Sequence, residues 1–267
     1  MPYPISKLWN LALENQKMDL DHCLTKALAA AGSQDPIPVF FRADDVAVPG
    51  KQFRELVDLF SRYQVPLSMS VVPAWLTGVR WKGIERLCNK APNLWCFYQH
   101  GWRHMNHETT GKKQEFGPAR PRAAIEHDLV CGRERLTSLM QDVFFPAFTP
   151  PWNRCSLEAL DVLTTSNCRA ISRSRGASPP APVGMPDFQI NVDLHTRPEP
   201  TPALGWKNLY AELATGIADG FCGIMIHHQR MNDNALAFLE GLLERMMAMD
   251  AFRFYHLKDL TEAHHEA

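Results

Sequence analysis

The sequence predicts an α/β protein in which parallel strands form a sheet with helices on its outside. Two observations lead to this prediction. Short apolar segments of strand character recur along the chain, and segments with apolar residues at helical spacing lie between them. The chain has 267 residues, of which 45% are hydrophobic, so it is long enough to bury one large core. Periodicity alone leaves open whether the strands close into a barrel or form an open sheet.

Eight segments are predicted to be buried strands because each is short and apolar and is bounded by polar, Gly or Pro residues. They are residues 37–43, 67–72, 94–99, 143–149, 168–172, 188–192, 222–226 and 252–255. Pro146 counts against the fourth segment, since proline lacks the amide hydrogen that a central strand donates to its neighbour.

Helices are predicted between these strands from the spacing of apolar residues. They span residues 52–63, 123–140, 157–165 and 234–249. Ser156 is expected to cap the helix at 157–165, with Glu158 and Asp161 in its first turns. The proline-rich residues 176–186 are predicted to form a loop that either borders the active site or is mobile.

Charge and hydropathy limit the partners of the protein. The chain carries 28 basic and 29 acidic residues, a formal net charge of −1, so we expect no nucleic-acid partner and no membrane-surface partner. No run of about 20 apolar residues occurs, so no membrane span is expected. The sequence makes no prediction of the oligomeric state.

The cysteines and the N-terminal residues indicate a reducing compartment. Seven cysteines are present at irregular spacing without a C-x-x-C pair, which argues against a disulfide framework and against a cysteine zinc site. Buried free thiols are therefore expected. The first residues lack the basic start and apolar run of a secretory signal, so a cytoplasmic location is expected.

Polar residues with catalytic chemistry follow five of the predicted strands, and in parallel α/β folds functional residues gather at the carboxyl ends of strands. These residues are Asp44 and Asp45, His100 and His104, Pro150 to Asn153, Asp193 and His195, and His227 and His228. Neighbouring carboxylates repel each other, so Asp44 and Asp45 are expected beside a cation or hydrogen-bond donors. Adjacent strand side chains diverge, so one of the pair can bind a metal while the other acts as a base.

His100 and His104 have the i, i+4 spacing that places two imidazoles on one side of a helical turn. Two histidines and one carboxylate form a recurrent catalytic set for zinc or iron, with open positions for water and substrate. A hydrolase also needs a base and an acid, for which Asp44 and His227 are candidates. Each pattern alone also fits a structural role, such as a solvated turn for the aspartates or a buried pair for His227 and His228.

Taken together, the motifs resemble the polysaccharide deacetylase family, also called the NodB homology or carbohydrate esterase family 4 group. The T-F-D-D-G-like first motif of the family reads RADDV at residues 42–46, and its H-[ST]-x-x-H motif reads HGWRH at 100–104. Its R-x-P-[YFW]-like motif reads TPPW at 149–152, its late acid is Asp193, and its L-x-H-like motif reads MIH at 225–227. The order and spacing fit over roughly residues 37–260.

The resemblance implies a distorted (β/α)7-type barrel of parallel strands with outer helices. The barrel domain would span residues 37–267, with residues 1–36 as a helical extension packed on it, for which Leu8, Leu11, Leu24 and Leu28 suggest an amphipathic helix. The implied reaction is removal of an acetyl group from an N-acylated sugar or oligosaccharide.

The resemblance also implies roles for individual residues. Asp45, His100 and His104 would bind one divalent metal ion, with zinc expected and cobalt, nickel, manganese or iron as alternatives. Asp44 would be the general base and His227 the general acid, with Asp193 orienting the acid. Trp152 would form a wall of the acyl pocket. The other candidate substrate-binding residues are Pro151, His228 and Arg42.

Three departures from the family pattern affect these expectations. Val46 replaces the glycine of the first motif, Gly101 replaces Ser or Thr in the second, and Thr149 replaces the arginine that holds the base. Threonine cannot form a bidentate ion pair, so Arg42 and Arg173 are candidates to steady Asp44. Alternative functions are hydrolysis of non-sugar amide bonds on the same barrel and non-catalytic carbohydrate binding. The expected partner is an N-acylated sugar or a small amide.

Overall fold

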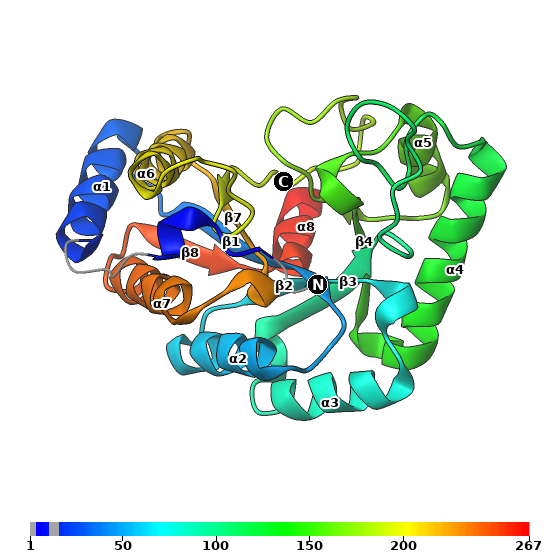
Figure 1. Ribbon diagram of the computed structural model, residues 1–267, viewed down its shortest axis with the longest axis horizontal. Coiled ribbons are helices and arrows are strands. Elements are labelled where there is room, and N and C mark those ends of the chain that lie inside the picture. The colour runs from blue at the N-terminus through cyan, green and yellow to red at the C-terminus, as the bar shows by residue number, and fades with distance from the viewer. Residues whose placement is uncertain (1–3, 11–15, 267) are drawn as a thin grey trace. The chain divides into compact units, whose positions relative to one another are not determined.

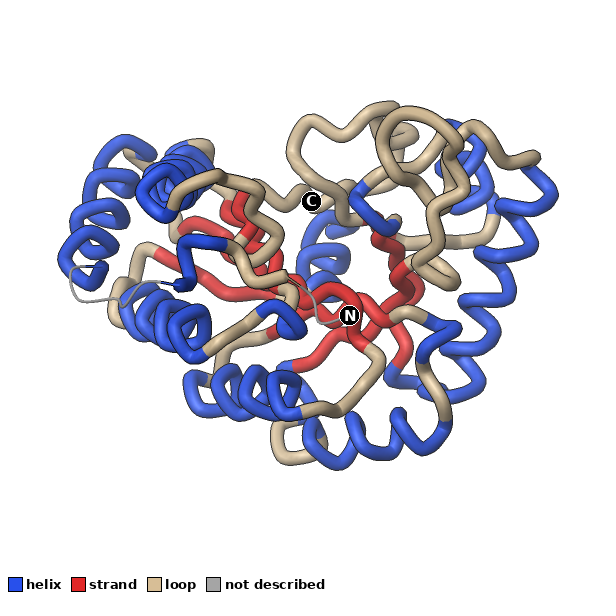
Figure 2. Tube along the Cα trace, viewed as in Figure 1, coloured by secondary structure: helices blue, strands red, loops and turns tan. Residues whose placement is uncertain are grey.

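The computed structural model describes residues 4–10 and 16–266 (Figure 1). The chain divides into two compact units. The first unit comprises Met1–Ala43, Gly50–Leu67 and Ile190–Tyr255, and the second comprises Asp44–Pro49, Ser68–Gln189 and His256–Ala267. Within each unit the strands lie inside and the helices lie outside (Figure 2).

In the first unit, strand β1 (Ile37–Val46, with residues up to Ala43 in this unit) pairs in parallel with β7 (Cys222–Ile226) and β8 (Phe252–Tyr255). Strand β6 (Val192–Asp193) pairs in parallel with β7. The helices of this unit are α1 (Gln16–Ala31), α2 (Lys51–Tyr63), α6 (Pro202–Ala218) and α7 (Asp233–Met247), with 3₁₀ turns η1 (Lys7–Asn10) and η6 (His228–Arg230).

In the second unit, the strands follow the order β5-β4-β3-β2, and β4 pairs in parallel with both β3 and β5. Their bounds are β2 (Leu67–Val71), β3 (Trp95–His100), β4 (Phe144–Thr149) and β5 (Ala170–Ile171). The helices are α3 (Gly78–Cys88), α4 (Arg122–Met140), α5 (Leu157–Thr165) and α8 (Leu257–Glu266), and the 3₁₀ turns are η2 (Pro73–Trp75), η3 (Pro92–Leu94), η4 (Gln141–Val143) and η5 (Pro151–Asn153).

Local sequence explains several of these elements. Helix α2 buries one apolar face that carries Phe53, Leu56, Val57, Leu59 and Phe60, as its spacing predicts. Helix α5 begins at the predicted cap, because the Ser156 hydroxyl accepts a hydrogen bond from the Ala159 amide at 3.3 Å. Pro146 lies where the register between β3 and β4 shifts, so the missing amide falls in an irregular part of the ladder.

The predicted α/β class, with parallel strands and outer helices, is confirmed. Strand β1 extends past the predicted end at residue 43, so Asp44 and Asp45 lie within the strand. The predicted strand at 188–192 is wrong in extent, because the regular pairing with β7 begins only at Val192. Residues 176–186 form a loop, as predicted. Helices α3, α6 and α8 had no counterpart among the predicted elements.

The N-terminal extension stays a prediction. In the first unit, α1 lies beside α6, where the Cys23 thiol contacts the Tyr210 carbonyl oxygen at 3.4 Å. Leu11, one of the four leucines behind the prediction, lies outside the described residues.

All seven cysteines are described and none forms a disulfide. Among residues 4–10 and 16–266, no helix combines the length and apolar character needed to cross a bilayer.

Candidate metal centre

Asp45, His100 and His104 come together in the second unit. Oδ1 of Asp45 lies 3.3 Å from Nε2 of His100 and 3.3 Å from Nε2 of His104. Two ligands bound tetrahedrally to zinc, at bond lengths of about 2.1 Å, stand about 3.4 Å apart, which matches both separations. Among the described residues this is also the one group of three or more acids, histidines or cysteines with all ligand atoms within 4.8 Å of one another. The donor set therefore fits one divalent metal ion.

The main chain of β4 sets which nitrogen of His100 is available to a metal. Nδ1 of His100 lies 3.0 Å from the Thr149 carbonyl oxygen, an acceptor, so Nδ1 carries the proton and donates it. In the neutral ring, the form that can bind a metal, the lone pair is then on Nε2, the nitrogen nearest Asp45. Such a second contact fixes the tautomer and the ring orientation of metal-binding histidines. Thr149 thus supports the candidate ligand through its backbone.

The pKa values of the two imidazoles shift in opposite directions. Burial alone would lower the pKa of His100, but the hydrogen bond to Asp45 and the charges of Asp44 and Asp45 outweigh it and raise the pKa. Burial and the charge of His100 lower the pKa of His104 to about 4. His100 is therefore more readily protonated than His104, and a metal that binds at Nε2 competes with that proton.

Unusual backbone conformations gather at this site. Asp45, His104 and Trp152 have φ values of 60°, 58° and 56°, in the left-handed region that few residues other than glycine adopt. Gly101, between the two histidines, has φ of 58°. Such conformations are costly and persist where surrounding contacts over-determine them, and they concentrate at functional sites.

Asp44, the candidate base, is buried beside β2. Its Oδ1 accepts a hydrogen bond of 2.7 Å from the Ser70 hydroxyl. The Thr149 hydroxyl, at the position of the family arginine, bonds to the Ser172 carbonyl at 3.1 Å and lies 3.1 Å from the Tyr98 hydroxyl. These contacts of the Thr149 hydroxyl are therefore with Ser172 and Tyr98, and not with Asp44.

The two arginines proposed to steady Asp44 differ in their contacts. Arg173 is committed elsewhere, because Nε and Nη2 bond to Asp187 at 3.0 and 2.8 Å and Nη1 bonds to the Pro179 carbonyl at 2.7 Å. Arg42 lies in the first unit, where it is fully buried and its Nη2 lies 3.2 Å from Sδ of Met225. Its suggested roles toward Asp44 and substrate stay predictions.

Two indole rings flank His104. The ring centroid of Trp152 lies 4.5 Å from that of His104, and the centroid of Trp75 lies 5.6 Å from it. Pro151, which begins η5, is buried next to Trp152. The structure thus places the predicted pocket residues Trp152 and Pro151 in the same unit as the metal ligands and adds Trp75 to the aromatic surface.

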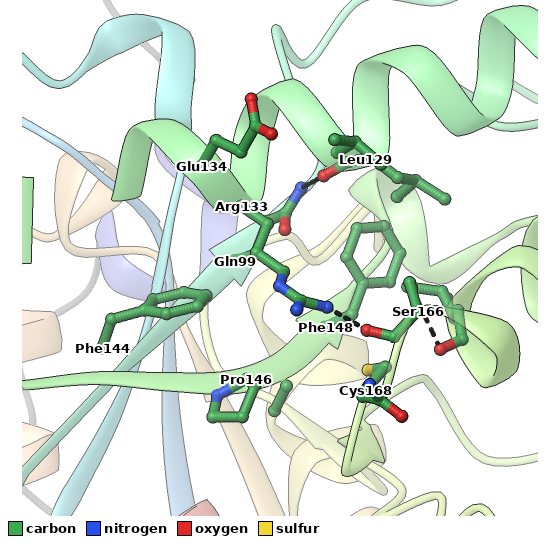
Figure 3. Close-up of a pocket in the computed structure, with 13 residues that line it drawn as sticks. Gln99, Leu129, Arg133, Glu134, Phe144, Pro146, Phe148, Ser166 and Cys168 are labelled. Atoms are coloured by element: carbon green, nitrogen blue, oxygen red, sulfur yellow. Dashed lines mark hydrogen bonds between the residues drawn. The ribbon is translucent and has the colours of Figure 1, made fainter. Parts of the chain in front are cut away.

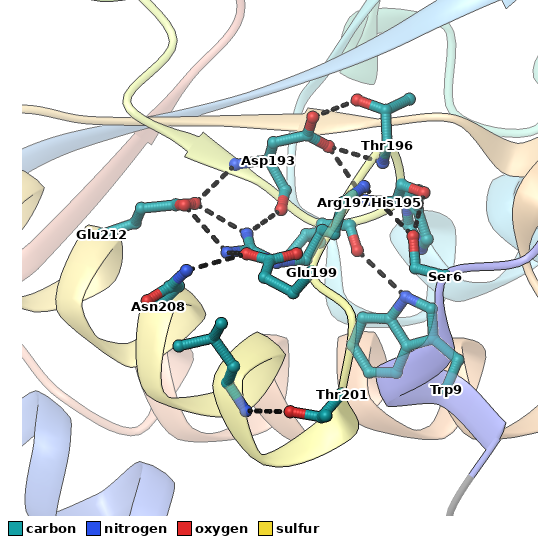
Figure 4. Close-up of polar contacts among 12 residues, drawn as sticks. Ser6, Trp9, Asp193, His195, Thr196, Arg197, Glu199, Thr201, Asn208 and Glu212 are labelled. Atoms are coloured by element: carbon teal, nitrogen blue, oxygen red, sulfur yellow. Dashed lines mark hydrogen bonds and ion pairs between the residues drawn. The ribbon is translucent and has the colours of Figure 1, made fainter.

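The other predicted residues lie in the first unit, where Asp193 and His195 lie at the end of β6 (Figure 4) and His227 and His228 follow β7. Asp193 turns back on its own loop, because Oδ1 accepts from the amides of His195 and Thr196 at 3.0 and 2.9 Å, and Oδ2 contacts the Thr196 hydroxyl. The His227 amide instead donates to Nδ1 of His195 at 3.2 Å. Orientation of His227 by Asp193 therefore stays a prediction, and His195 is the histidine that contacts its backbone.

The N-terminal segment holds the loop that carries His195 (Figure 4). The Ser6 hydroxyl donates to the His195 carbonyl at 2.7 Å, and the Trp9 indole donates to the Leu194 carbonyl at 3.0 Å. Arg197 then ties the same loop to Glu212 through two contacts of 2.8 and 2.9 Å. His195 itself is fully buried.

The burial of His195 predicts a pH dependence of folding. Burial, followed by the charges of His227, His228 and Arg230, holds the pKa of His195 well below its usual value. Above pH about 6.5 the ring is neutral in both states, and below it only the unfolded chain takes up the proton, so this residue costs up to about 1.4 kcal/mol of stability per pH unit of acidification.

We therefore expect His195→Gln to flatten the fall in unfolding free energy between pH 7 and pH 5, measured by urea denaturation. His22→Gln, at an exposed site in α1, serves as the control and should keep the wild-type slope. An unchanged slope in His195→Gln would contradict the assignment of a neutral buried ring.

A pocket of about 230 Å³ lies elsewhere in the second unit, between α4, α5 and strands β3 and β4 (Figure 3). Its walls include Gln99, Leu129, Arg133, Phe144 and Phe148. None of the three candidate metal ligands lines it. Since side chains alternate along a strand, Gln99 points to the opposite face of β3 from His100.

Comparison with known proteins identifies which known fold this chain has. No family model matches the sequence, and no curated protein matches it. A protein from Mycobacterium smegmatis named as a polysaccharide deacetylase matches over 87% of this chain and 91% of its own, with a TM-score of 0.66 and 13% identity. The fold is that of the polysaccharide deacetylases.

Two further solved structures show the range of proteins with the polysaccharide deacetylase fold. A family 4 acetyl xylan esterase from Clostridium thermocellum, in complex with a cobalt ion, has a TM-score of 0.57 at 14% identity, over 85% of this chain and 91% of its own. A family 4 pseudoenzyme from Bacillus anthracis has a TM-score of 0.52 at 11% identity, over 85% and 66%. At such low identities the similarity shows the fold alone. Proteins with this fold include both enzymes and a pseudoenzyme.

Sequence reasoning missed three residues of the site. Ser70 had a usable signal, because Ser68 and Ser70 are the polar positions that alternate in an otherwise apolar strand. Trp75 lies in a short 3₁₀ turn with no periodicity to mark it. Glu115, which contacts the loop between the two histidines, lies in a polar stretch without any pattern.

Proposed function

We propose that this protein is a metal-dependent hydrolase that removes an acyl group, acetyl in the first instance, from an N-acylated sugar. The observation that carries the proposal is the set of Asp45 Oδ1, His100 Nε2 and His104 Nε2 at the spacing of ligands on one ion. Three protein ligands leave coordination positions open, as in catalytic zinc sites. The polysaccharide deacetylase fold supports the same reaction class.

Each residue of the site has a part in this reaction. A divalent ion bound there would polarise the amide carbonyl and lower the pKa of water. Asp44 would accept the proton of the attacking water, and the Ser70 hydroxyl, which donates to Oδ1 of Asp44, would orient its carboxylate. Trp75 and Trp152 offer flat apolar faces beside His104, which suit the acyl group or a sugar ring.

The leaving amine needs a proton, and His227 is the proposed donor. It is half-buried, whereas His195 is fully buried with its pKa held well below the usual value. A ring that resists protonation is a poor proton donor near neutral pH. This contrast favours His227 over His195 as the acid.

We expect His227→Ala to lower kcat by roughly 10²–10⁴-fold, the range for loss of a general acid, with the zinc content unchanged. His195→Gln should retain more activity than His227→Ala, because it removes a contact to the His227 backbone and no proton donor. Equal rates for wild type and His227→Ala would assign the acid to another residue, with His228 the first alternative.

The proposal is tested by acetate release. Protein purified without chelator is incubated with N-acetylglucosamine oligomers and, in parallel, with small N-acetyl amides, before and after removal of metal and readdition of zinc or cobalt. We expect release that is lost with metal and regained on readdition. Metal-free protein with no affinity for zinc or cobalt would contradict the proposal. Release from the small amides alone would favour hydrolysis of non-sugar amide bonds.

A non-catalytic, carbohydrate-binding function is the second candidate. Two observations favour it: Thr149 occupies the position of the family arginine, and a pseudoenzyme shares the fold. A mutant of that pseudoenzyme is described as having restored enzymatic activity. Sugar binding without any acetate release, in metal-loaded protein, would support this candidate.

A further inference from the structure

One carboxylate holds the loop between the two histidine ligands. Glu115 is fully buried, and its Oε2 accepts a hydrogen bond from the Trp102 amide at 3.1 Å. Its Oε1 accepts from the Arg103 amide at 2.6 Å. Two of the three residues between His100 and His104 therefore donate their amides to the same side chain. Hydrogen bonds from amides to a carboxylate are charge-assisted and stronger than neutral ones.

The same carboxylate occupies the space beside Gly101. A Cβ atom built on Gly101 would lie 2.2 Å from Glu115 Oε2 and 2.5 Å from Cγ of Pro151, so no side chain fits there. The second motif of the polysaccharide deacetylases has Ser or Thr at this position. In this chain Gly101 leaves room for the Glu115 carboxylate, which reaches the loop from outside it.

Glu115 stands on a rigid part of the second unit. The next residue, Phe116, is fully buried, and its carbonyl accepts from the Ser156 amide at 2.7 Å. The Phe116 ring packs edge-on against Phe148 at 5.6 Å between centroids. Nη1 of Arg120 donates to the Glu115 carbonyl at 3.3 Å. The backbone that carries the carboxylate is therefore fixed by packing and by hydrogen bonds on both sides.

We propose that Glu115 is a positioning residue for the metal site, which holds the backbone at 101–103 so that His100 and His104 face Asp45 before an ion binds. The inference rests on the proposed metal site and adds to it the residue that pre-organises it. His104 needs such support because its φ of 58° is unfavourable in isolation. A site whose ligands are held in place loses less entropy when the metal binds.

Zinc affinity tests the inference directly. Glu115→Gln keeps the size of the side chain, but its amide nitrogen is a donor and cannot accept from a loop amide. We expect the zinc Kd, measured by competition with a chromophoric chelator, to rise about 10–100-fold, as for other changes behind metal ligands. Glu115→Asp, which keeps the charge but shortens the reach, should give a smaller rise and serves if Glu115→Gln does not fold.

Glu108→Gln is the matched control. Glu108 Oε1 accepts from the Ala119 amide at 3.2 Å in the same stretch of chain, but no contact joins its carboxylate to residues 101–104. We expect this variant to keep the wild-type zinc Kd. Equal Kd values for wild type and Glu115→Gln, or equal losses in Glu115→Gln and Glu108→Gln, would overturn the inference. Wild-type protein that binds no zinc would instead overturn the proposed function.

Discussion

Asp45→Ala should weaken zinc binding by more than about 10²-fold, because changes behind a metal ligand already cost 10–100-fold and this change removes a ligand itself. Oδ1 of Asp45 is the atom that lies 3.3 Å from both histidine Nε2 atoms, so its loss leaves two imidazoles and no anionic donor. Acetate release should fall with the metal content. Isothermal titration with zinc measures the first effect, and an acetate assay measures the second.

Asp142→Ala provides a control in the same unit, since Asp142 is an exposed acid in η4. It should bind zinc as the wild type does. Wild-type affinity in Asp45→Ala would mean that the ion is held by another group, and the proposed donor set would be wrong.

Asp44→Asn should retain the metal while turnover falls by at least about 10²–10⁴-fold, the contribution of a general base. The asparagine oxygen can still accept the hydrogen bond from Ser70, so the geometry of the strand end should survive the change. What is lost is the ability to take up a proton. The measurement is kcat at saturating zinc, together with the zinc content of the same sample.

The variants of the two aspartates are expected to differ in metal content: Asp44→Asn should keep the metal and Asp45→Ala should lose it. The comparison therefore distinguishes the base from the ligand. Asp44→Asn that loses its metal would show that Asp44 is a ligand, and the assignments of Asp44 and Asp45 would have to be exchanged. Asp44→Asn that keeps both metal and full turnover would assign the base to a different residue.

Much of the fold was predictable because most strands and helices carry their own pattern. The apolar runs at β2, β7 and β8 coincide with the predicted segments almost residue for residue. Helix α5 was predicted with its cap, since Ser156 is among the residues that accept the first free amides of a helix.

Two of the missed helices have starts that the sequence signals, because Thr77 caps α3 and Thr201 caps α6. The start of α8 is less usual. Helix α8 begins with a reciprocal pair in which the Asp259 amide donates to Nδ1 of His256 and the His256 amide donates to Oδ2 of Asp259. This arrangement resembles a capping box, but histidine is not among the common cap residues. Helix α6 contains Gly205, against which Leu8 packs closely. No local pattern encodes that contact.

The candidate site was predictable to the extent that its residues follow strands. Asp45 lies near the end of β1 and His100 ends β3, so strand ends identify these two residues. The helical turn predicted for His100 and His104 is wrong, because residues 101–104 form a bend in which His104 has φ of 58°. Ser70 bonds to Asp44, and Glu115 bonds to the amides of Trp102 and Arg103, so both act through contacts between separate segments of the chain. Their contribution depends on which chain segments the fold brings together, and spacing cannot reveal it.

Diffraction at the zinc absorption edge, from crystals grown with zinc, locates the ion directly. We expect one strong anomalous peak at about 2.0–2.2 Å from Oδ1 of Asp45 and from Nε2 of both His100 and His104. A zinc-loaded crystal with no peak between these three atoms, or with its peak on other residues, would contradict the proposed donor set.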